Sequence, residues 1–101
     1  MIEHIVFWKL KPFANGMSKE QNALAIKEKL EALNGKIEGC ISLKVSFDLL
    51  HTEESADVVL YSKFENLEAL KFYAEHPLHK AVMPFIAEVR LERRVIDIEV
   101  E

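Results

Sequence analysis

Tyr73, His76 and His79 place one phenol and two imidazoles within seven residues. A neutral imidazole can accept a proton near physiological pH, and a phenol can donate a hydrogen bond to a developing oxyanion. The pattern is suited to proton abstraction next to a carbonyl, with His79 as the general base and Tyr73 as the oxyanion donor. In the alternative interpretation, His76 closes a helix C-terminus and His79 caps or packs the next turn, without any chemistry.

Other histidine and aromatic side chains could complete a ligand site. His4 and Trp8 lie on one face of a predicted first strand, and we expect both, together with His76, to contact a ligand. Further aromatic candidates for a pocket wall are Phe47, Tyr61 and Phe85. Such residues are more often plain core, as is a lone histidine on an apolar face. A metal site from His4, His76 and His79 is possible by ligand type, but no carboxylate or cysteine spacing supports it.

The elements that must position these side chains follow from apolar periodicity. Alternating apolar residues predict strands over residues 3–11, 40–48, 56–64 and 89–99. Residues 12–16 are predicted to form a loop. Ser18 and Gln21 have the spacing of a capping box, so a first helix should begin there and end near Gly35.

The second helix is expected to begin at Asn66, which can cap it, and to end at about His76. Its end is set by Pro77, because a proline disfavours helical geometry in the residue before it. A further short helical turn is expected over residues 79–87. The predicted order is therefore β-α-β-β-α-β, the split pattern of ferredoxin-like α+β folds, with an antiparallel sheet.

One face of this predicted sheet lacks a cover. Right-handed crossovers place both long helices on the same face, and we assign His4, Val6 and Trp8 to the opposite face. Leaving large apolar side chains in water would forfeit roughly 1.5–3 kcal/mol each. A second copy of the chain is the simplest cover, so we expect a homodimer in which two sheets pair as a dimeric α/β barrel.

Composition excludes several functional classes. A length of 101 residues indicates one domain over 1–101, and a net charge of −4 without a basic stripe argues against nucleic-acid binding. The cluster of Arg90, Arg93 and Arg94 is interrupted by glutamates and is interpreted as a solvated strand face. Cys40 is the only cysteine, which excludes an internal disulfide. Without a signal peptide or membrane span, we expect a cytoplasmic protein with no membrane contact and no cofactor.

Four segments together resemble one known family. They are EHIVFWKLK at residues 3–11, LNGKIEGC at 33–40, FENLEAL at 64–70 and HPLH at 76–79. The chain resembles the stress-responsive A/B barrel (Dabb) family over nearly its whole length. The resemblance implies a dimeric α/β barrel of ferredoxin-like subunits, whose members mostly have no established activity.

The resemblance also implies roles for particular residues. One plant branch of the family, olivetolic acid cyclase, closes a linear polyketide by aldol condensation. Tyr73 matches its active-site tyrosine, His79 its catalytic histidine and His4 a first-strand histidine that faces the same cavity. Some plant relatives hold a cation on main-chain carbonyls after the first helix, which would correspond here to the carbonyls of Asn34, Ile37 and Cys40.

Three functional hypotheses follow. The first is a small homodimeric A/B barrel protein of unassigned activity that binds an apolar or aromatic small molecule in the barrel cavity. The second is a cyclase or lyase that abstracts a proton alpha to a carbonyl, with His79 and Tyr73 in the roles given above. The third is a related dimeric-barrel oxygenase or haem-handling protein, for which the sequence has no further marker.

Overall fold

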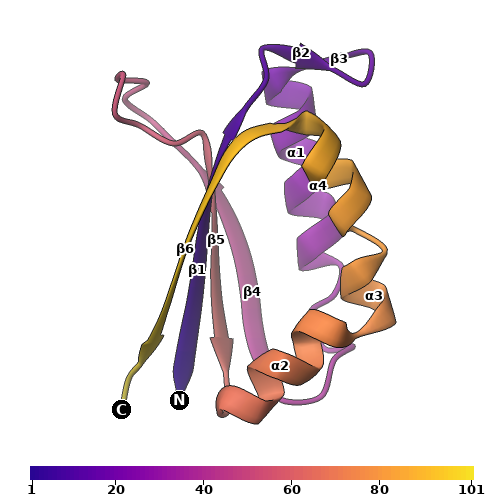
Figure 1. Cartoon of the computed structure of the whole chain (residues 1–101), viewed down its shortest axis with the longest axis vertical. Helices are drawn as coiled ribbons and strands as arrows, with labels where there is room; N and C mark the ends of the chain where they lie inside the picture. Colours follow the sequence, from indigo (N-terminus) through magenta and orange to yellow (C-terminus); the bar gives the residue numbers. More distant parts are fainter.

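The computed structural model describes residues 1–101 and shows a four-stranded antiparallel sheet with helices on one face (Figure 1). In spatial order, the strands are β4 (Cys40–Phe47), β5 (Val58–Phe64), β1 (Ile2–Leu10) and β6 (Arg90–Glu99). The helices are α1 (Lys19–Glu31), α2 (Leu67–Glu75), α3 (Pro77–Lys80) and α4 (Met83–Val89). The predicted ferredoxin-like α+β fold is confirmed, and no helix is long and apolar enough to cross a membrane.

Three helix termini follow the predicted local chemistry, but the first helix ends at Glu31, four residues before the predicted stop at Gly35. Ser18 Oγ accepts the Gln21 N–H at 3.2 Å, and Gln21 Oε1 accepts the Ser18 N–H at 2.9 Å, so the capping box is complete. Asn66 Oδ1 accepts the Ala69 N–H at 2.9 Å and begins α2. The α2 helix ends at Glu75, directly before the His76–Pro77 pair.

The single helical turn expected over residues 79–87 is wrong: two short helices, α3 and α4, occupy this region. Pro84 supplies the reason, because it lies in the first turn of α4. In a continuous helix its ring would clash with the carbonyl of Lys80, and no N–H would be present to bond it. The chain therefore ends one helix at Lys80 and begins the next at Met83.

The predicted loop at residues 12–16 contains part of a small β-hairpin. Strands β2 (Phe13–Ala14) and β3 (Met17–Ser18) pair across Asn15 and Gly16, whose φ angles are 54° and 74°. Two successive residues in the left-handed region suit the type I′ turn that Asn-Gly favours. Asn22 Nδ2 donates to the carbonyls of Ala14 and Met17, which fastens the hairpin to α1.

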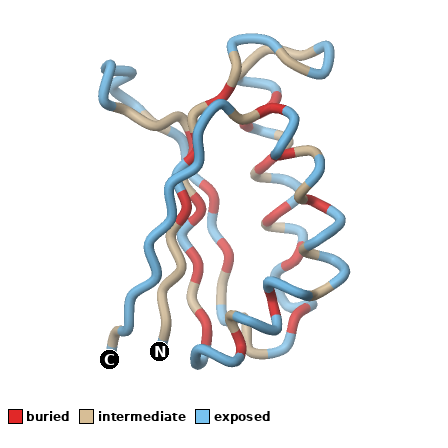
Figure 2. Tube along the Cα trace, in the orientation of Figure 1, coloured by how far each residue is buried: buried red, intermediate tan, exposed pale blue.

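The assignment of His4, Val6 and Trp8 to the uncovered face is wrong. Val6 and Trp8 are 1% and 3% exposed and share one core cluster with residues of α1, α2 and α4, so this face of β1 lies beneath the helices. Figure 2 shows buried segments both in the sheet and in the helices that cover it. Ile5 and Phe7 occupy the other face. Both faces of β1 are apolar. The alternation of side chains along the strand assigns them to two faces but does not show which face the helices cover.

We call the uncovered side of the sheet the open face. Phe7 and Tyr61 on this face are 40% and 38% exposed, and Ile96 is 52% exposed. Strand pairing places the following apolar residues together on it: Ile5, Phe7, Val59, Tyr61, Ile96 and Ile98. An uncovered apolar surface therefore exists, as predicted, but it is made by the opposite set of β1 residues.

The outer edge of the sheet at β4 is closed by side chains from α1 and from the turn after it. The Asn34 amide both donates to the Leu43 carbonyl at 2.9 Å and accepts the Leu43 N–H at 2.8 Å. One turn earlier, Glu31 Oε2 accepts the Val45 N–H and Lys27 Nζ donates to the Val45 carbonyl. These bonds replace the missing neighbouring strand and protect β4 from pairing with another chain.

Candidate functional site

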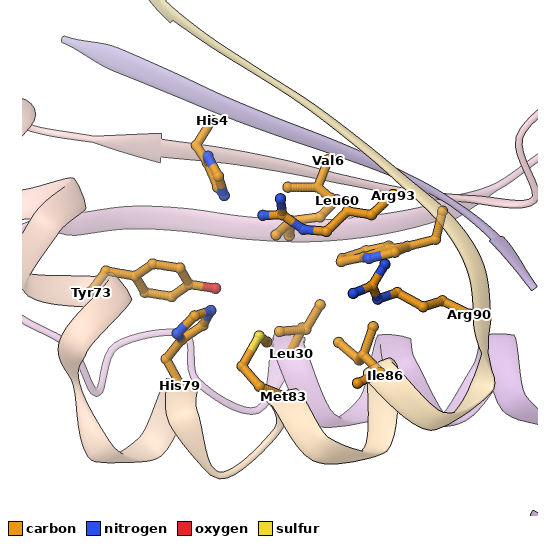
Figure 3. A pocket seen from close by; sticks show the side chains of 12 residues that line it. His4, Val6, Leu30, Leu60, Tyr73, His79, Met83, Ile86, Arg90 and Arg93 are labelled. Carbon is orange, nitrogen blue, oxygen red and sulfur yellow. The ribbon is translucent and has the colours of Figure 1, made fainter.

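A cavity of about 190 Å³ lies between the sheet and the helical layer. Its apolar wall consists of Val6, Trp8, Leu30, Leu60, Met83 and Ile86. His4, Tyr73 and His79 bring polar groups to one end (Figure 3). Ala87 and Arg93 are the exposed residues of the lining, so the mouth lies between α4 and β6. A mostly apolar cavity with a few convergent polar groups is typical of a small-molecule site.

Tyr73 comes from the last turn of α2 and is 1% exposed. Its ring packs against Phe64 at 4.9 Å and against His79 at 4.3 Å between centroids. Burial raises the pKa of its phenol far above the ordinary value, so the hydroxyl keeps its proton at physiological pH. The hydroxyl oxygen has no hydrogen-bond partner although it is buried. Tyr73 therefore presents an unused donor to the cavity.

His79 lies on α3, directly after the Pro77 break, and its ring faces the cavity beside the Tyr73 hydroxyl (Figure 3). Its Nδ1 lies 3.2 Å from the Ala74 carbonyl. A carbonyl can only accept, so this bond places the proton on Nδ1 and leaves Nε2 of the neutral ring as the acceptor. Burial lowers the pKa of His79, the hydrogen bond to the Ala74 carbonyl raises it in part, and the neighbouring groups His4 (when protonated) and Arg93 lower it further. The neutral, basic form is thereby favoured near pH 7.

In the alternative interpretation, His76 and His79 only close or cap helices, and this accounts for part of the geometry. The Ala74 carbonyl belongs to the last turn of α2, so His79 does help to close that helix. His76 closes α2 as its C-cap and also begins α3, where its Nδ1 accepts the Leu78 N–H at 3.1 Å. His76 does not line the cavity. Its proposed contact with a ligand stays a prediction.

His4 lines the cavity from β1, and its Nδ1 is hydrogen-bonded to Asp97 Oδ1 on the neighbouring strand β6. A carboxylate only accepts, so His4 also carries its proton on Nδ1. His4 is therefore a partnered side chain, as expected for a histidine on an apolar face, that nonetheless keeps its second ring nitrogen available. Its ring centroid is 6.4 Å from that of Tyr73.

Of the four aromatic residues considered for a pocket wall, Trp8 alone lines this cavity. The Trp8 ring is almost wholly buried, and its Nε1–H has no acceptor in the chain. Phe47 lies near the end of β4, Tyr61 belongs to the open face, and Phe85 contacts Lys29 outside the cavity. The ring of an indole donates only, so Trp8 adds a second unused donor to that of Tyr73.

Arg90 and Arg93 were missed as site residues, because their charge run is typical of a solvated strand face. Both line the cavity. With strict alternation, two residues three positions apart would lie on opposite faces. The pairing of β1 with β6 shifts register between Lys9 and Leu10, so Arg93 pairs with Trp8 while Arg90 pairs with Leu10 on the same face. The sequence carries no clear signal for such a bulge.

No group of three histidine, cysteine or acidic side chains is arranged to hold a metal ion. The main-chain carbonyls of Asn34, Ile37 and Cys40 lie in and after the turn that follows α1, where the Ile37 carbonyl accepts the Cys40 N–H at 3.2 Å. A cation on these carbonyls stays a prediction. The Cys40 thiol is partly buried, which raises its pKa to about 11.

Comparison with protein families identifies one family for this chain. The family model described as the stress responsive A/B barrel domain matches residues 2–100. An uncharacterized protein of Streptomyces coelicolor, SCO4036, is 32% identical over 82 residues, covering 80% of this chain and 81% of the relative.

Two solved structures extend the comparison to the fold. A dimeric ferredoxin-like protein of unknown function from Bacteroides fragilis has a TM-score of 0.81 and 33% identity, covering 98% of this chain and 95% of its own. A dimeric ferredoxin-like protein of unknown function from Thermobifida fusca has a TM-score of 0.82, covering 98% and 90% at 17% identity. At that identity the second likeness shows the fold alone.

Proposed function

The chain belongs to the stress-responsive A/B barrel domain family, and on that premise we propose that it is a homodimer whose subunits each bind a small, mostly apolar molecule. The ligand occupies the cavity beside Tyr73 and His79. The observation that carries this proposal is the pair of buried donors, Tyr73 Oη and Trp8 Nε1, which have no partner within the chain. Burying an unpaired polar group costs about 1–3 kcal/mol, and a ligand that accepts both bonds offsets that cost.

The size of the cavity limits the ligand. A cavity of roughly 150 Å³ lined by apolar residues holds one benzene molecule, and the cavity here measures about 190 Å³. It therefore suits one six-membered ring with a small substituent. Longer molecules would extend through the mouth between α4 and β6.

The open face supports the homodimer. Its apolar residues form one contiguous surface that no helix of the chain covers. Contiguous exposed apolar surface usually marks an interface, and solved relatives with this fold are described as dimeric. A second copy placed face to face would bury both open faces in a barrel core.

A charged substitution on the open face tests the dimer. Ile96→Glu is expected to convert a particle of twice 11.6 kDa into one of 11.6 kDa in light scattering at micromolar concentration. Phe13→Glu is the matched control, because Phe13 is 69% exposed but lies on the β2–β3 hairpin, away from the sheet. A wild-type monomer, or equal effects of the two substitutions, would contradict the face-to-face arrangement.

A second candidate function is favoured by the state of His79. Its Nδ1–H is engaged by Ala74, its pKa is lowered, and its Nε2 is left free beside the Tyr73 hydroxyl. His79 Nε2 would take a proton from the carbon next to a carbonyl. The electron pair of that C–H bond would form the carbon–carbon double bond of an enolate, and the π pair of the carbonyl would move to its oxygen. Tyr73 would stabilise the resulting enolate by donating its unused hydrogen bond.

Deuterium exchange tests this chemistry without knowledge of the natural substrate. Acetophenone has one ring and a slowly exchanging methyl group next to a carbonyl. We expect the wild type to accelerate its deuteration in D₂O, followed by NMR, and His79→Gln to remove the acceleration while the protein stays folded. His51→Gln is the control, since His51 lies exposed in the β4–β5 connection. Equal rates for the wild type and His79→Gln would exclude His79 as the base.

A further inference from the structure

The mouth of the cavity carries two positive side chains that nothing in the chain neutralises. Arg90 and Arg93 line the cavity, and neither guanidinium group forms an ion pair or a hydrogen bond within the chain. Both groups point into the cavity (Figure 3). No aspartate or glutamate belongs to the lining. Glu92, the neighbour of Arg93 on β6, pairs with Lys9 on the opposite face of the sheet, and Asp97, further along β6, is engaged by His4.

The two ends of the cavity differ in hydrogen-bonding character. The register of β1 and β6 places His4 beside Asp97 at one end, and Trp8 beside Arg93 and Leu10 beside Arg90 at the other. The arginine end presents donors only, because guanidinium groups and the indole N–H cannot accept. The histidine end presents the Tyr73 hydroxyl and the free ring nitrogens. A matching ligand must bring acceptors, and preferably negative charge, to the arginine end.

We propose that the cavity selects a single-ring carboxylate, whose carboxylate oxygens accept hydrogen bonds from Arg90, Arg93 and Trp8 Nε1. The ring lies against the apolar wall, and any further polar substituent points toward Tyr73 and His79. This inference rests on the proposed function, namely that the cavity holds a ligand, and adds the class of that ligand. It also gives a role to the register shift, which brings both arginines to the face that Trp8 occupies.

Geometry and charge favour a carboxylate over other acceptors. The guanidinium fork matches the two oxygens of a carboxylate, and charge-assisted bonds are about twice as strong as neutral ones. A neutral amide would leave the two positive charges unmatched and would turn an N–H group toward donors. An inorganic phosphate would satisfy the arginines but leave the apolar wall empty.

Trp8 provides a specific reporter, because it is the only tryptophan in the chain. We suggest following its indole N–H signal by NMR while the protein is titrated with benzoate, benzamide or inorganic phosphate in a low-chloride buffer at pH 7. Benzoate is expected to shift the signal with a Kd in the millimolar range, since a ligand of this size gains little total binding energy. Benzamide should bind at least tenfold more weakly, and phosphate should leave the Trp8 signal unmoved.

Substitutions separate the arginine contribution from that of the cavity. Arg93→Gln and the double variant Arg90→Gln/Arg93→Gln are expected to weaken benzoate binding at least tenfold and to leave benzamide binding unchanged. Lys71→Gln removes the same charge from an exposed position on α2 outside the cavity and should leave both affinities unchanged.

The outcomes also separate this inference from the proposed function. Equal affinities for benzoate and benzamide, or benzoate binding that survives the double variant, would overturn the carboxylate inference and leave the ligand cavity intact. Phosphate that binds as tightly as benzoate would likewise overturn it, in favour of a general anion site. If none of the probes moves the Trp8 signal, the proposed ligand cavity itself fails.

Discussion

Tyr73→Phe is expected to stabilise the unliganded protein, although it removes a side-chain group from the centre of the candidate site. The Tyr73 hydroxyl is buried without a partner, whereas in the unfolded chain it would be hydrogen-bonded to water. Phenylalanine keeps the ring and its packing against Phe64 and His79. The substitution therefore removes a desolvation penalty and little else.

The size of the effect follows from the penalty. An unsatisfied buried polar group costs about 1–3 kcal/mol, so we expect the free energy of unfolding to rise by about 1 kcal/mol, the lower end of that range. For a domain of this length, about 1 kcal/mol corresponds to a rise in Tm of roughly 4–8 °C. A gain of stability from a substitution in the site would indicate that the hydroxyl is kept for function.

Thermal unfolding followed by circular dichroism measures this effect, with all variants at one protein concentration because a dimer unfolds with a concentration-dependent Tm. Tyr61→Phe is the matched control. The Tyr61 hydroxyl already donates to Glu3 Oε2 at 2.7 Å, so its removal should give no gain in stability. A Tm for Tyr73→Phe several degrees below that of the wild type would refute the reasoning, since it would show that the hydroxyl is hydrogen-bonded in the folded protein.

Three further predictions concern His79, Cys40 and Gly39. As the pH falls below about 6.5, the ordinary pKa of histidine, the unfolded chain should bind a proton at His79 before the folded chain does, because burial lowers the pKa in the folded state. The urea midpoint of unfolding should therefore drop more between pH 7 and 5.5 for the wild type than for His79→Gln. Equal drops would contradict a lowered pKa of His79. Cys40 should react with a thiol reagent at pH 8 roughly 100-fold more slowly in the folded protein than in urea, because burial raises its pKa from 9.0 to about 11. Equal reaction rates in the two states would show that the Cys40 thiolate is accessible in the folded protein. Gly39→Ala should destabilise the fold by more than about 2 kcal/mol, since φ is +84° and the new Cβ would lie 2.6 Å from the Ala69 Cβ. Gly16→Ala is the control: its new Cβ would have no atom within 4 Å, so it should cost only about 1–2 kcal/mol of backbone strain. Similar losses of stability in chemical denaturation would argue against the close contact of Gly39 with α2.

Much of the fold could be predicted because its signals are local. A capping box at Ser18, a cap at Asn66 and a proline at position 77 each act on a few neighbouring residues, and the structure contains all three helix boundaries where they were expected. The prediction failed over the α3–α4 region, where one helical turn was expected. Pro84 divides the segment into two helices, because in a continuous helix its ring would clash with the Lys80 carbonyl. A search for apolar periodicity does not consider this effect.

Only part of the candidate site could be predicted from such local signals. Tyr73 and His79 were predicted to share the site because they are only six positions apart in the sequence, with one proline between them. Arg90 was missed as a site residue because its place in the cavity depends on a register shift between two strands that are nearly 80 residues apart in the chain. That register shift is a property of strand pairing, and no residue type in the sequence indicates it.

The sequence by itself determined the kinds of element, their order and the presence of an apolar sheet surface without a cover, because periodicity and capping are properties of short segments. Only the tertiary structure decided which face of β1 that surface is. Helix crossovers placed Val6 and Trp8 beneath the helices and Ile5 and Phe7 on the open face, although the two sets are similarly apolar. The same packing left Tyr73 and Trp8 with buried donors that lack acceptors. Whether a polar group is satisfied depends on every neighbour that folding brings to it, and that information exists only in three dimensions.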